Sequence, residues 1–492
     1  MFSTMTLFFL DFNPRALLLA VWAGFLPAWL LAAERPNVLF ILTEDSGHLS
    51  FLGTPGLQTP AMDSLARSGV YFKNFFVGYP VCSPSKACIY TGLHNHENGI
   101  LNNTQNYFKP ASRLTDAERK NSLYVKNRIH ADIPTLVERL HEAGYYQGIM
   151  GKLHVAPLEK FPYDEYSKSY SGAAVAAFIA RAKQTGKPWH LFDNVEISHR
   201  PFTDSDKQKI KVNPADVKLP AFLADTPKVR QDWAEYLDAI ENADKYVGEA
   251  MQALRASGQE SNTVVICMQG DHGAAFPHGK MTLYDFGLRV TLSINWPGLT
   301  HPAISEALVS ELDFTPTLLD LLGLPPMPRT DGISLRSVLQ DATTPVHKYI
   351  FAEISDKGAL PNNGMQERSV CDGRWHLIYR EKLTPPWRQV QADSKDWAKW
   401  RNRTYDDTVK FKDKFPAPYE ILAEMDPQSL HGKVRPIELY DLQSDPDELH
   451  DLAYDAKART ELERLYTALR QWVHDTGDTS VQPPTTVVQY LK

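Results

Sequence analysis

The sequence predicts an α/β fold: a large, mostly parallel sheet with helices on both faces, followed by a smaller C-terminal α+β subdomain. Short apolar runs, typical of strands buried on both faces, alternate with capped amphipathic helices over residues 37–323. Beyond about Thr343, strand-like runs follow one another closely, as in a short antiparallel sheet. The length of 492 residues is sufficient for two substantial cores.

The first 33 residues predict a signal peptide that is not part of the fold. Arg15 precedes the apolar run ALLLAVWAGFLPAWLLAA, and Ala32 and Ala33 then meet the polar ERPN. An uncleaved membrane anchor is the alternative, because a leucine stands three residues before either cleavage position. A signal peptide predicts a secreted, periplasmic or lysosomal protein.

The large domain is expected to begin with the apolar run NVLFILT at 37–43. A helix follows, with Thr59 as N-cap, Pro60 at its first position and Gly69 at its exit. Strands that alternate with helices in this way favour parallel neighbours. The further elements are a helix at 132–144, strands at 145–151 and 189–197, a helix at 227–258, strands at 262–270 and 290–296, and a helix at 312–323.

The smaller subdomain is predicted to contain strands at 348–355 and 368–380, close enough in sequence for antiparallel pairing. A loop-rich insert with many Trp and Pro residues follows at 383–435, and an amphipathic helix covers 458–476. The predicted domains are a signal peptide at 1–33, a large α/β domain at 34–343 and a C-terminal subdomain at 344–492.

Composition limits the partners. The net charge of -7 argues against nucleic acid, and an anionic small substrate requires cations that converge locally. The four cysteines, at 82, 88, 267 and 371, are too few for a dense disulfide framework. Cys267 lies in the apolar run TVVICM and is predicted to be a small core side chain. Nothing in the sequence indicates the oligomeric state.

Acidic residues follow two of the predicted strands. Glu44 and Asp45 come directly after 37–43, and Asp271 and His272 follow the strand at 262–270. Ligands of open α/β sheets collect beyond the carboxyl ends of strands, so these residues are candidates for one shared metal site. Three carboxylates and one imidazole favour Ca²⁺ or Mg²⁺ over Zn²⁺. A solvated turn is the alternative for either pair alone.

The stretch YPVCSPSKACIYTG, residues 79–92, places Cys82 at or just before a predicted helix start. Free backbone N–H groups and the helix dipole favour negative charge there, which would lower the pKa of the thiol. A buried cysteine beside a Ser-Pro turn is the alternative.

Cations also occur in loops marked by glycine or proline, after strands or next to the metal candidates. If they converge, they supply the local positive field that the acidic chain otherwise lacks; solvated surface is the alternative. These residues are Lys152 and His154 in GKLH, His199 and Arg200 in SHRPF, and His278 and Lys280 in PHGKMTLYD.

Together these motifs resemble the sulfatases of the alkaline-phosphatase superfamily. Residues 82–86, CSPSK, resemble the signature in which a cysteine, a proline two residues on and an arginine four residues on direct oxidation of the cysteine to formylglycine. TGLHNHENG, GKLH, GDHG and HGK follow in the family's order, and the resemblance extends from about Asn37 to ELYDLQSDPDELHDLA near Tyr454. GIMGKLHVAP and DTPKVRQDWAEYLDAIENAD are most similar to the heparan N-sulfatase (N-sulfoglucosamine sulfohydrolase) branch.

The resemblance implies an alkaline-phosphatase-like fold and a sulfatase that hydrolyses sulfate esters or N-sulfate groups of sulfated glycans. Glu44, Asp45, Asp271 and His272, with the modified Cys82, would hold one Ca²⁺ against the sulfate oxygens. Formylglycine at Cys82 would hydrate, and one oxygen would attack sulfur while the other later loses a proton, so that the aldehyde reforms and sulfate leaves. A formylglycine-generating enzyme is the implied partner during maturation.

Five cations complete the implied site. Lys86 and His154 would hold the hydrated formylglycine. Lys152, His199 and Lys280 would stabilise the sulfuryl oxygens and protonate the leaving group, so that the chemistry is mostly positioning and charge neutralisation.

Three residues depart from the family pattern. Glu44 stands where the family usually has Asp, and Lys86 stands where it has Arg, which removes the planar fork. The N-sulfatase branch has a histidine near Glu196. The departures keep three alternatives open: a sulfatase for another sulfated carbohydrate, a phosphoester hydrolase of the superfamily, and a catalytically impaired, sulfatase-like binding protein.

Overall fold

The structure is a computed structural model that describes residues 35–202, 211–355, 366–381, 401–425 and 430–491. The expected signal peptide at 1–33 and much of the insert at 383–435 lie outside the described residues, so both stay predictions. Within the described part, no helix is both long and apolar enough to cross a bilayer.

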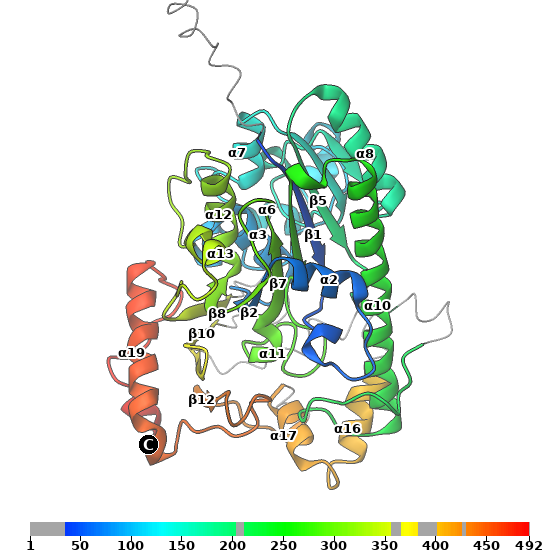
Figure 1. The fold of residues 1–492 in the computed structure, drawn as a ribbon. Helices are drawn as coiled ribbons and strands as arrows, with labels where there is room; N and C mark the ends of the chain where they lie inside the picture. The colour runs from blue at the N-terminus through cyan, green and yellow to red at the C-terminus, as the bar shows by residue number, and fades with distance from the viewer. Residues whose placement is uncertain (1–34, 203–210, 356–365, 382–400, 426–429, 492) are drawn as a thin grey trace, which may run out of the picture. The chain divides into compact units, whose positions relative to one another are not determined.

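An eight-stranded sheet forms the centre of the large layered part (Figure 1), with the strand order β4-β3-β5-β1-β6-β7-β2-β8. The strands from β4 to β6 in this order are mutually parallel, whereas β7 runs antiparallel to both of its neighbours and β2 is parallel to β8. The predicted mostly parallel sheet is thus confirmed. The strands are β1 (Asn37–Thr43), β2 (Val70–Phe76), β3 (Tyr146–Gly151), β4 (Glu165–Ser167), β5 (Trp189–Val195), β6 (Thr263–Gln269), β7 (Arg289–Asn295) and β8 (Ala303–Ser310).

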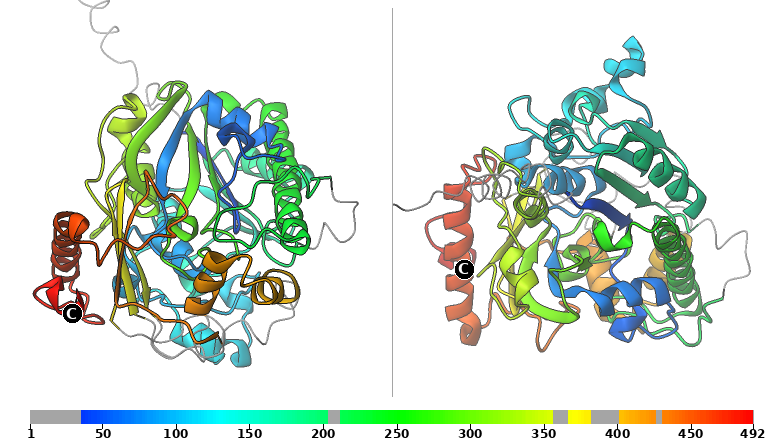
Figure 2. Two further views of the ribbon diagram at one scale, coloured as in Figure 1. Left: turned by 90° about the horizontal axis from the view of Figure 1, so that it is seen from below. Right: turned by 45° about the horizontal axis from the view of Figure 1, so that its top comes forward.

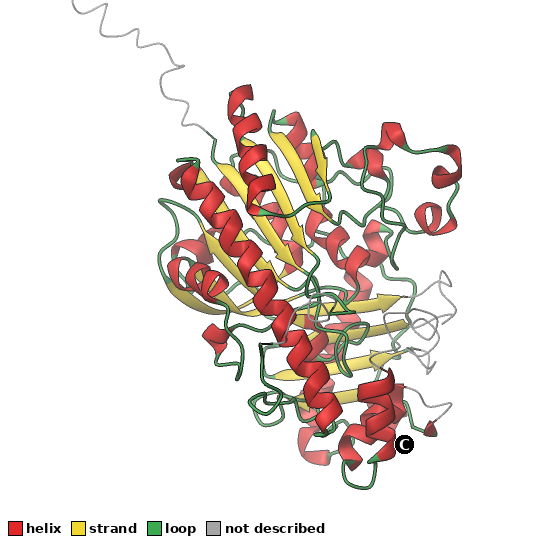
Figure 3. Cartoon of the chain, turned by 90° about the vertical axis from the view of Figure 1, so that its right-hand side faces the viewer, coloured by secondary structure: helices red, strands yellow, loops and turns green. Residues whose placement is uncertain are grey.

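Helices cover both faces of this sheet, in front of the strands and behind them in Figure 3. Alternate side chains of β1 enter two cores: Phe40 packs with α3, α7 and α12, and Ile41 packs with α2, α8 and α10. The helices are α2 (Pro60–Ser68), α3 (Cys82–Thr91), α4 (Asn95–Asn98), α5 (Asp116–Arg119), α6 (Ser122–Lys126), α7 (Leu136–Glu142), α8 (Gly172–Thr185), α10 (Pro227–Ala256), α11 (Asp285–Leu288), α12 (Phe314–Leu321), α13 (Arg336–Gln340), α16 (Asp406–Lys410), α17 (Pro416–Met425) and α19 (Arg459–Asp475).

A second, antiparallel sheet has the order β12-β11-β10-β9, and α19 packs on one of its faces (Figure 2). Leu377 faces α19, whereas its neighbour Ile378 joins the core of the large part. The predicted short sheet and terminal helix are confirmed; the domain boundary after residue 343 stays a prediction. The strands are β9 (Ile350–Ser355), β10 (Gln366–Cys371), β11 (Trp375–Arg380) and β12 (Ile437–Asp441).

Candidate active site

The carboxyl ends of β1 and β6 bring the two acidic pairs together. The strands are parallel neighbours, and Thr43 pairs with Gln269, so the residues that follow them leave the sheet side by side. The backbone N–H of Asp45 donates to Asp271 Oδ1 at 3.3 Å. Gly270 permits this approach, because its φ is 91° and a Cβ there would lie 2.2 Å from the Ser46 carbonyl oxygen.

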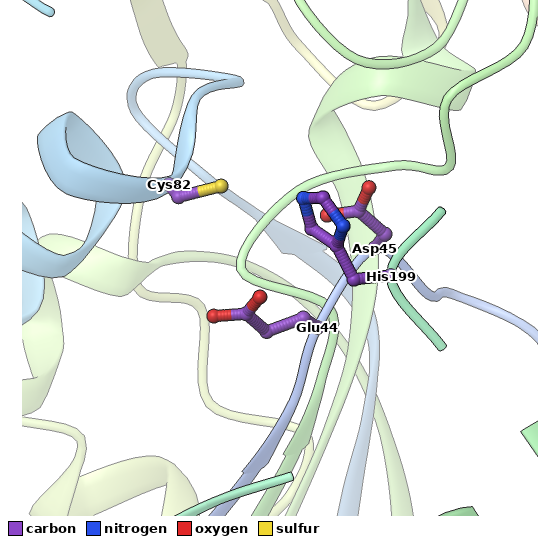
Figure 4. A group of neighbouring side chains, drawn as sticks. All are labelled: Glu44, Asp45, Cys82 and His199. Atoms are coloured by element: carbon purple, nitrogen blue, oxygen red, sulfur yellow. The ribbon is translucent and has the colours of Figure 1, made fainter. Parts of the chain in front are cut away.

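Four ligand-type side chains converge at this edge. One atom each of Asp45, Cys82, Asp271 and His272 lies within 4.8 Å of the others, and Glu44 forms a similar group with Asp45, Cys82 and His199 (Figure 4). Ligand atoms 2.3–2.6 Å from one ion span up to about 5 Å, so the set fits a single cation. Its carboxylate oxygens suit Ca²⁺ or Mg²⁺.

His272 presents one ring nitrogen to this group. Its Nδ1 pairs with the Gly273 carbonyl at 2.9 Å, and its Nε2 lies 3.3 Å from Cys82 Sγ and 3.5 Å from Asp45 Oδ1. Burial alone would lower the pKa of His272, but Asp271 and Asp45 raise it to about 9. The ring is therefore oriented by the backbone and held by the carboxylates.

Cys82 is the first residue of α3, as the sequence predicts, and its side chain is almost fully buried. Burial opposes ionisation of the thiol, yet Lys152, Lys280 and His272 lower its pKa well below the usual range. The surroundings of position 82 therefore stabilise a negatively charged group there.

Two buried lysines share Glu44. Lys86 Nζ lies 2.6 Å from Glu44 Oε1 and 2.8 Å from Asp271 Oδ2, while Lys152 Nζ lies 2.8 Å from Glu44 Oε2. Burial would lower the pKa of Lys86, but Asp271 and Glu44 raise it. The Lys86 ammonium group therefore binds the carboxylates of Glu44 and Asp271. Glu44 has a longer side chain than aspartate, so its one carboxylate can accept from both Lys86 and Lys152.

The remaining predicted cations surround Cys82. Lys280 Nζ lies 3.1 Å from Asp45 Oδ2 and 3.1 Å from His199 Nε2. His154 Nε2 lies 2.8 Å from the Thr104 carbonyl, which directs its Nδ1 elsewhere. His154, His199 and nearby Glu196 are only half-buried, whereas the lysines are buried, so the site opens on the side of these three residues.

Two loop cations face away from the site. Arg200 makes two hydrogen bonds to buried Asp232, at 2.9 and 3.0 Å. His278 stacks on Tyr284, with 3.7 Å between ring centroids, and its Nδ1 lies 3.2 Å from the Asp447 carbonyl oxygen. Both side chains are thus engaged with residues outside the cluster around Cys82, where they support loops.

The side chains that hold Glu44 were not predicted from the sequence. Asn194 Nδ2 donates to Glu44 Oε1 at 3.3 Å, and the Ser198 hydroxyl donates to the Glu44 carbonyl. Asn194 could have been noticed as a polar residue near the carboxyl end of the otherwise apolar run WHLFDNV.

The sheet topology, the acids at its carboxyl edge and the small second sheet define an alkaline-phosphatase-like α/β fold. The chain belongs to the sulfatase family, whose sequence profile matches residues 36–324, and it is a sulfuric ester hydrolase. Both results confirm what the motifs around Cys82 predict.

Its relatives include carbohydrate sulfatases. The human protein named N-sulphoglucosamine sulphohydrolase is 28% identical, over 93% of this chain and 94% of the relative. An "Ulvan-active sulfatase" of Formosa agariphila is 24% identical, over 91% of this chain and 81% of the relative. A solved structure described as a 2-O GAG sulfatase superposes with a TM-score of 0.63 at 19% identity, covering 90% of this chain and 93% of that one, which shows the shared fold.

Proposed function

We propose that the protein removes sulfate groups from a sulfated carbohydrate, with Cys82 converted to formylglycine and one divalent cation bound beside it. The observation that carries the proposal is the convergence of four ligand-type side chains and three buried lysines around Cys82. The names of the relatives, which include N-sulphoglucosamine and ulvan enzymes, support a sulfated carbohydrate as the substrate class.

Glu44, Asp45, Asp271 and His272 would hold the cation, together with the group at position 82, and Ca²⁺ is the ion that we propose. The cation would supply positive charge to the sulfate oxygens. Lys86 lies between Glu44 and Asp271, so its proposed task is to keep these two carboxylates in place. That differs from the direct contact with the hydrated formylglycine that the family resemblance implies.

Lys152 and Lys280 would neutralise charge that develops on the sulfuryl oxygens, because both ammonium groups act on position 82 and both are buried. His199 stands beside Lys280 on the open side of the site, where the rest of the substrate must lie. It is therefore the proposed proton donor to the leaving group. Formylglycine would supply the nucleophilic oxygen.

His154 is proposed to act on position 82 through Nδ1. Its Nε2 is engaged by the Thr104 carbonyl, which leaves the other nitrogen to accept a hydrogen bond. Nδ1 is buried and has no hydrogen-bond partner among the described residues, and His154 contributes to the lowered pKa of the Cys82 thiol.

N-sulfoglucosamine is the substrate that we propose to test first, because the human relative aligns over nearly the whole chain. An O-sulfated glucosamine and a phosphate monoester represent the alternative substrates. The impaired, binding-only alternative rests on the three departures from the family pattern together, at Lys86, Glu44 and Glu196.

The experiment is co-expression with a formylglycine-generating enzyme, mass spectrometry of the peptide containing Cys82, and sulfate or phosphate release from the three substrates. We expect aldehyde at residue 82 and sulfate release that Cys82→Ala abolishes. Phosphate release alone would favour the phosphoester hydrolase. Aldehyde without release from any substrate would favour the binding protein, and a fully unmodified Cys82 in an active enzyme would refute the formylglycine proposal.

A further inference from the structure

A segment beside the site, residues 103–128, is joined to it by hydrogen bonds at its start and closes back on its own first residue at its end; we name it the cationic arm. At its start, the Thr104 N–H donates to Ser83 Oγ at 3.1 Å and the Thr104 carbonyl meets His154. At its end, Asn127 Nδ2 donates to the Asn103 carbonyl at 3.3 Å. The arm therefore leaves from and returns to the neighbourhood of Cys82, on the half-exposed His154 side.

The arm is strongly basic in an acidic protein. It contains six cations, Lys109, Arg113, Arg119, Lys120, Lys126 and Arg128, and two acids, Asp116 and Glu118. Its net charge is thus about +4, against -7 for the whole chain. A local charge of opposite sign to the whole marks a surface that attracts anions.

Four of these cations have no acidic partner in the described part of the chain. Lys109 pairs with Glu118 at 2.7 Å and Arg119 with Glu159 at 2.9 Å. The other four side chains are exposed and form no ion pair with any residue that the structure describes; they are Arg113, Lys120, Lys126 and Arg128. No described carboxylate neutralises their charges, so they can bind an external anion; the Arg128 guanidinium also lies over the Tyr124 ring, 5.9 Å from its centroid.

The arm is ordered by its own contacts. Thr115 and Glu118 form a capping box at the start of α5, and Asn121 caps α6. Tyr124 is buried against Tyr107, with 5.4 Å between the ring centroids. In the right-hand view of Figure 2 this cyan segment projects at the top. The free cations thus stand on a fixed platform, which reduces the entropy lost when a ligand binds.

We propose that Arg113, Lys120, Lys126 and Arg128 bind the remainder of a sulfated oligosaccharide whose terminal sulfated unit occupies the active site. The inference rests on the proposed function and extends it from a single sugar to a polyanionic chain. Exposed charges contribute little individually, but four of them act on one flexible polyanion, and salt screens them. The positive charge of the arm is complementary to the negative charge of a sulfated chain, which is therefore the ligand that we propose.

The test compares two fourfold variants with the same change in net charge. The arm variant carries Arg113→Gln, Lys120→Gln, Lys126→Gln and Arg128→Gln. The control variant carries Lys183→Gln, Lys187→Gln, Lys348→Gln and Lys457→Gln, four exposed lysines that lie outside the arm. Binding of a heparin hexasaccharide is measured in the Cys82→Ala background, so that turnover cannot interfere.

We expect the arm variant to bind the hexasaccharide about tenfold more weakly at low salt, and the control variant to bind within about twofold of the parent. The difference should vanish near 0.5 M NaCl, where the Debye length is only a few ångström. With Cys82 intact, kcat/KM should fall about tenfold for the hexasaccharide and stay unchanged for N-sulfoglucosamine.

Equal hexasaccharide affinity of the arm and control variants would overturn the inference, as would an equal loss of activity on the single sugar. A DNA oligonucleotide of the same charge that binds the arm as tightly as the hexasaccharide would also overturn it, because the arm would then be a general polyanion surface. The binding measurement stands even if no substrate is cleaved, so failure of the proposed function remains distinguishable.

Discussion

Asp193 is expected to make the protein less stable as the pH rises. It lies in the middle of β5, between Ile41 of β1 and Met150 of β3, in a face that α8 and α10 cover with apolar side chains. Neither carboxyl oxygen has a hydrogen-bond partner among the described residues. Burial therefore raises the pKa of Asp193 to about 8.

The direction and size of the effect follow from proton linkage. An aspartate ionises near pH 4 in the unfolded chain and near pH 8 in this fold, so folding takes up a proton between these values. The contribution of Asp193 to stability is highest below about pH 4, falls by about 1.4 kcal/mol per pH unit and levels off above about pH 8. From pH 5 to pH 9 the loss is therefore about 4 kcal/mol. For a unit of about 460 residues, this corresponds to about 4 °C in Tm.

The assay is thermal unfolding from pH 5 to pH 9 for the parent, Asp193→Asn and Asp132→Asn. Asp132 is exposed and serves as the matched control. We expect the Tm of Asp193→Asn to gain about 4 °C on the parent across this range, while Asp132→Asn follows the parent. A constant difference between the parent and Asp193→Asn would refute the reasoning, because Asp193 would then ionise like a solvated carboxyl.

Three further predictions concern the site. Lys86→Arg should raise the aldehyde fraction or sulfate release. Lys86→Ala should nearly abolish release, because it removes the ammonium group that binds Asp271 and one of the two that bind Glu44, at roughly 3–5 kcal/mol; unchanged release in Lys86→Ala would contradict this role. Asp271→Ala should abolish release, and a chelator should lower the Tm of the parent but not of this variant. Glu448→Gln should reduce kcat/KM several-fold and leave the aldehyde fraction intact, because Asp285 N–H loses a charged acceptor; full activity would argue against it.

The metal candidates were predictable because they depend on topology. Buried apolar runs identify β1 and β6 directly, and parallel strands deliver whatever follows them to the same edge of the sheet. Glu44, Asp45, Asp271 and His272 needed no contact information beyond that rule. The helix start at Cys82 was equally local, because a Pro two residues later suits the first turn of a helix.

Two strands, β2 and β8, were not predicted from the sequence, and neither were the partners of Lys86. Both depend on contacts between residues that are distant in sequence. β2 carries Lys73 and Asn74 in its middle, and β8 lies at the sheet edge with two exposed positions, so neither has a continuous apolar run. Spacing along α3 places Lys86 near Cys82, yet the ammonium instead meets Glu44 and Asp271. In a buried site the two carboxylates outcompete a single neutral or thiol group for a cation, and only the fold shows that they are within reach.

The second sheet contributes to the site because the segment that follows it supports the loop that carries Lys280. Glu448, just after β12, accepts from the Asp285 N–H at 2.5 Å through one oxygen and meets His376 Nδ1 of β11 at 2.6 Å through the other. His278, which lies two residues before Lys280, contacts the carbonyl oxygen of Asp447. Lys280 Nζ lies 3.1 Å from Asp45 Oδ2, and a loop without support would not hold it at that distance. The antiparallel sheet therefore acts as the fixed support for Lys280, a cation of the site at the edge of the parallel sheet.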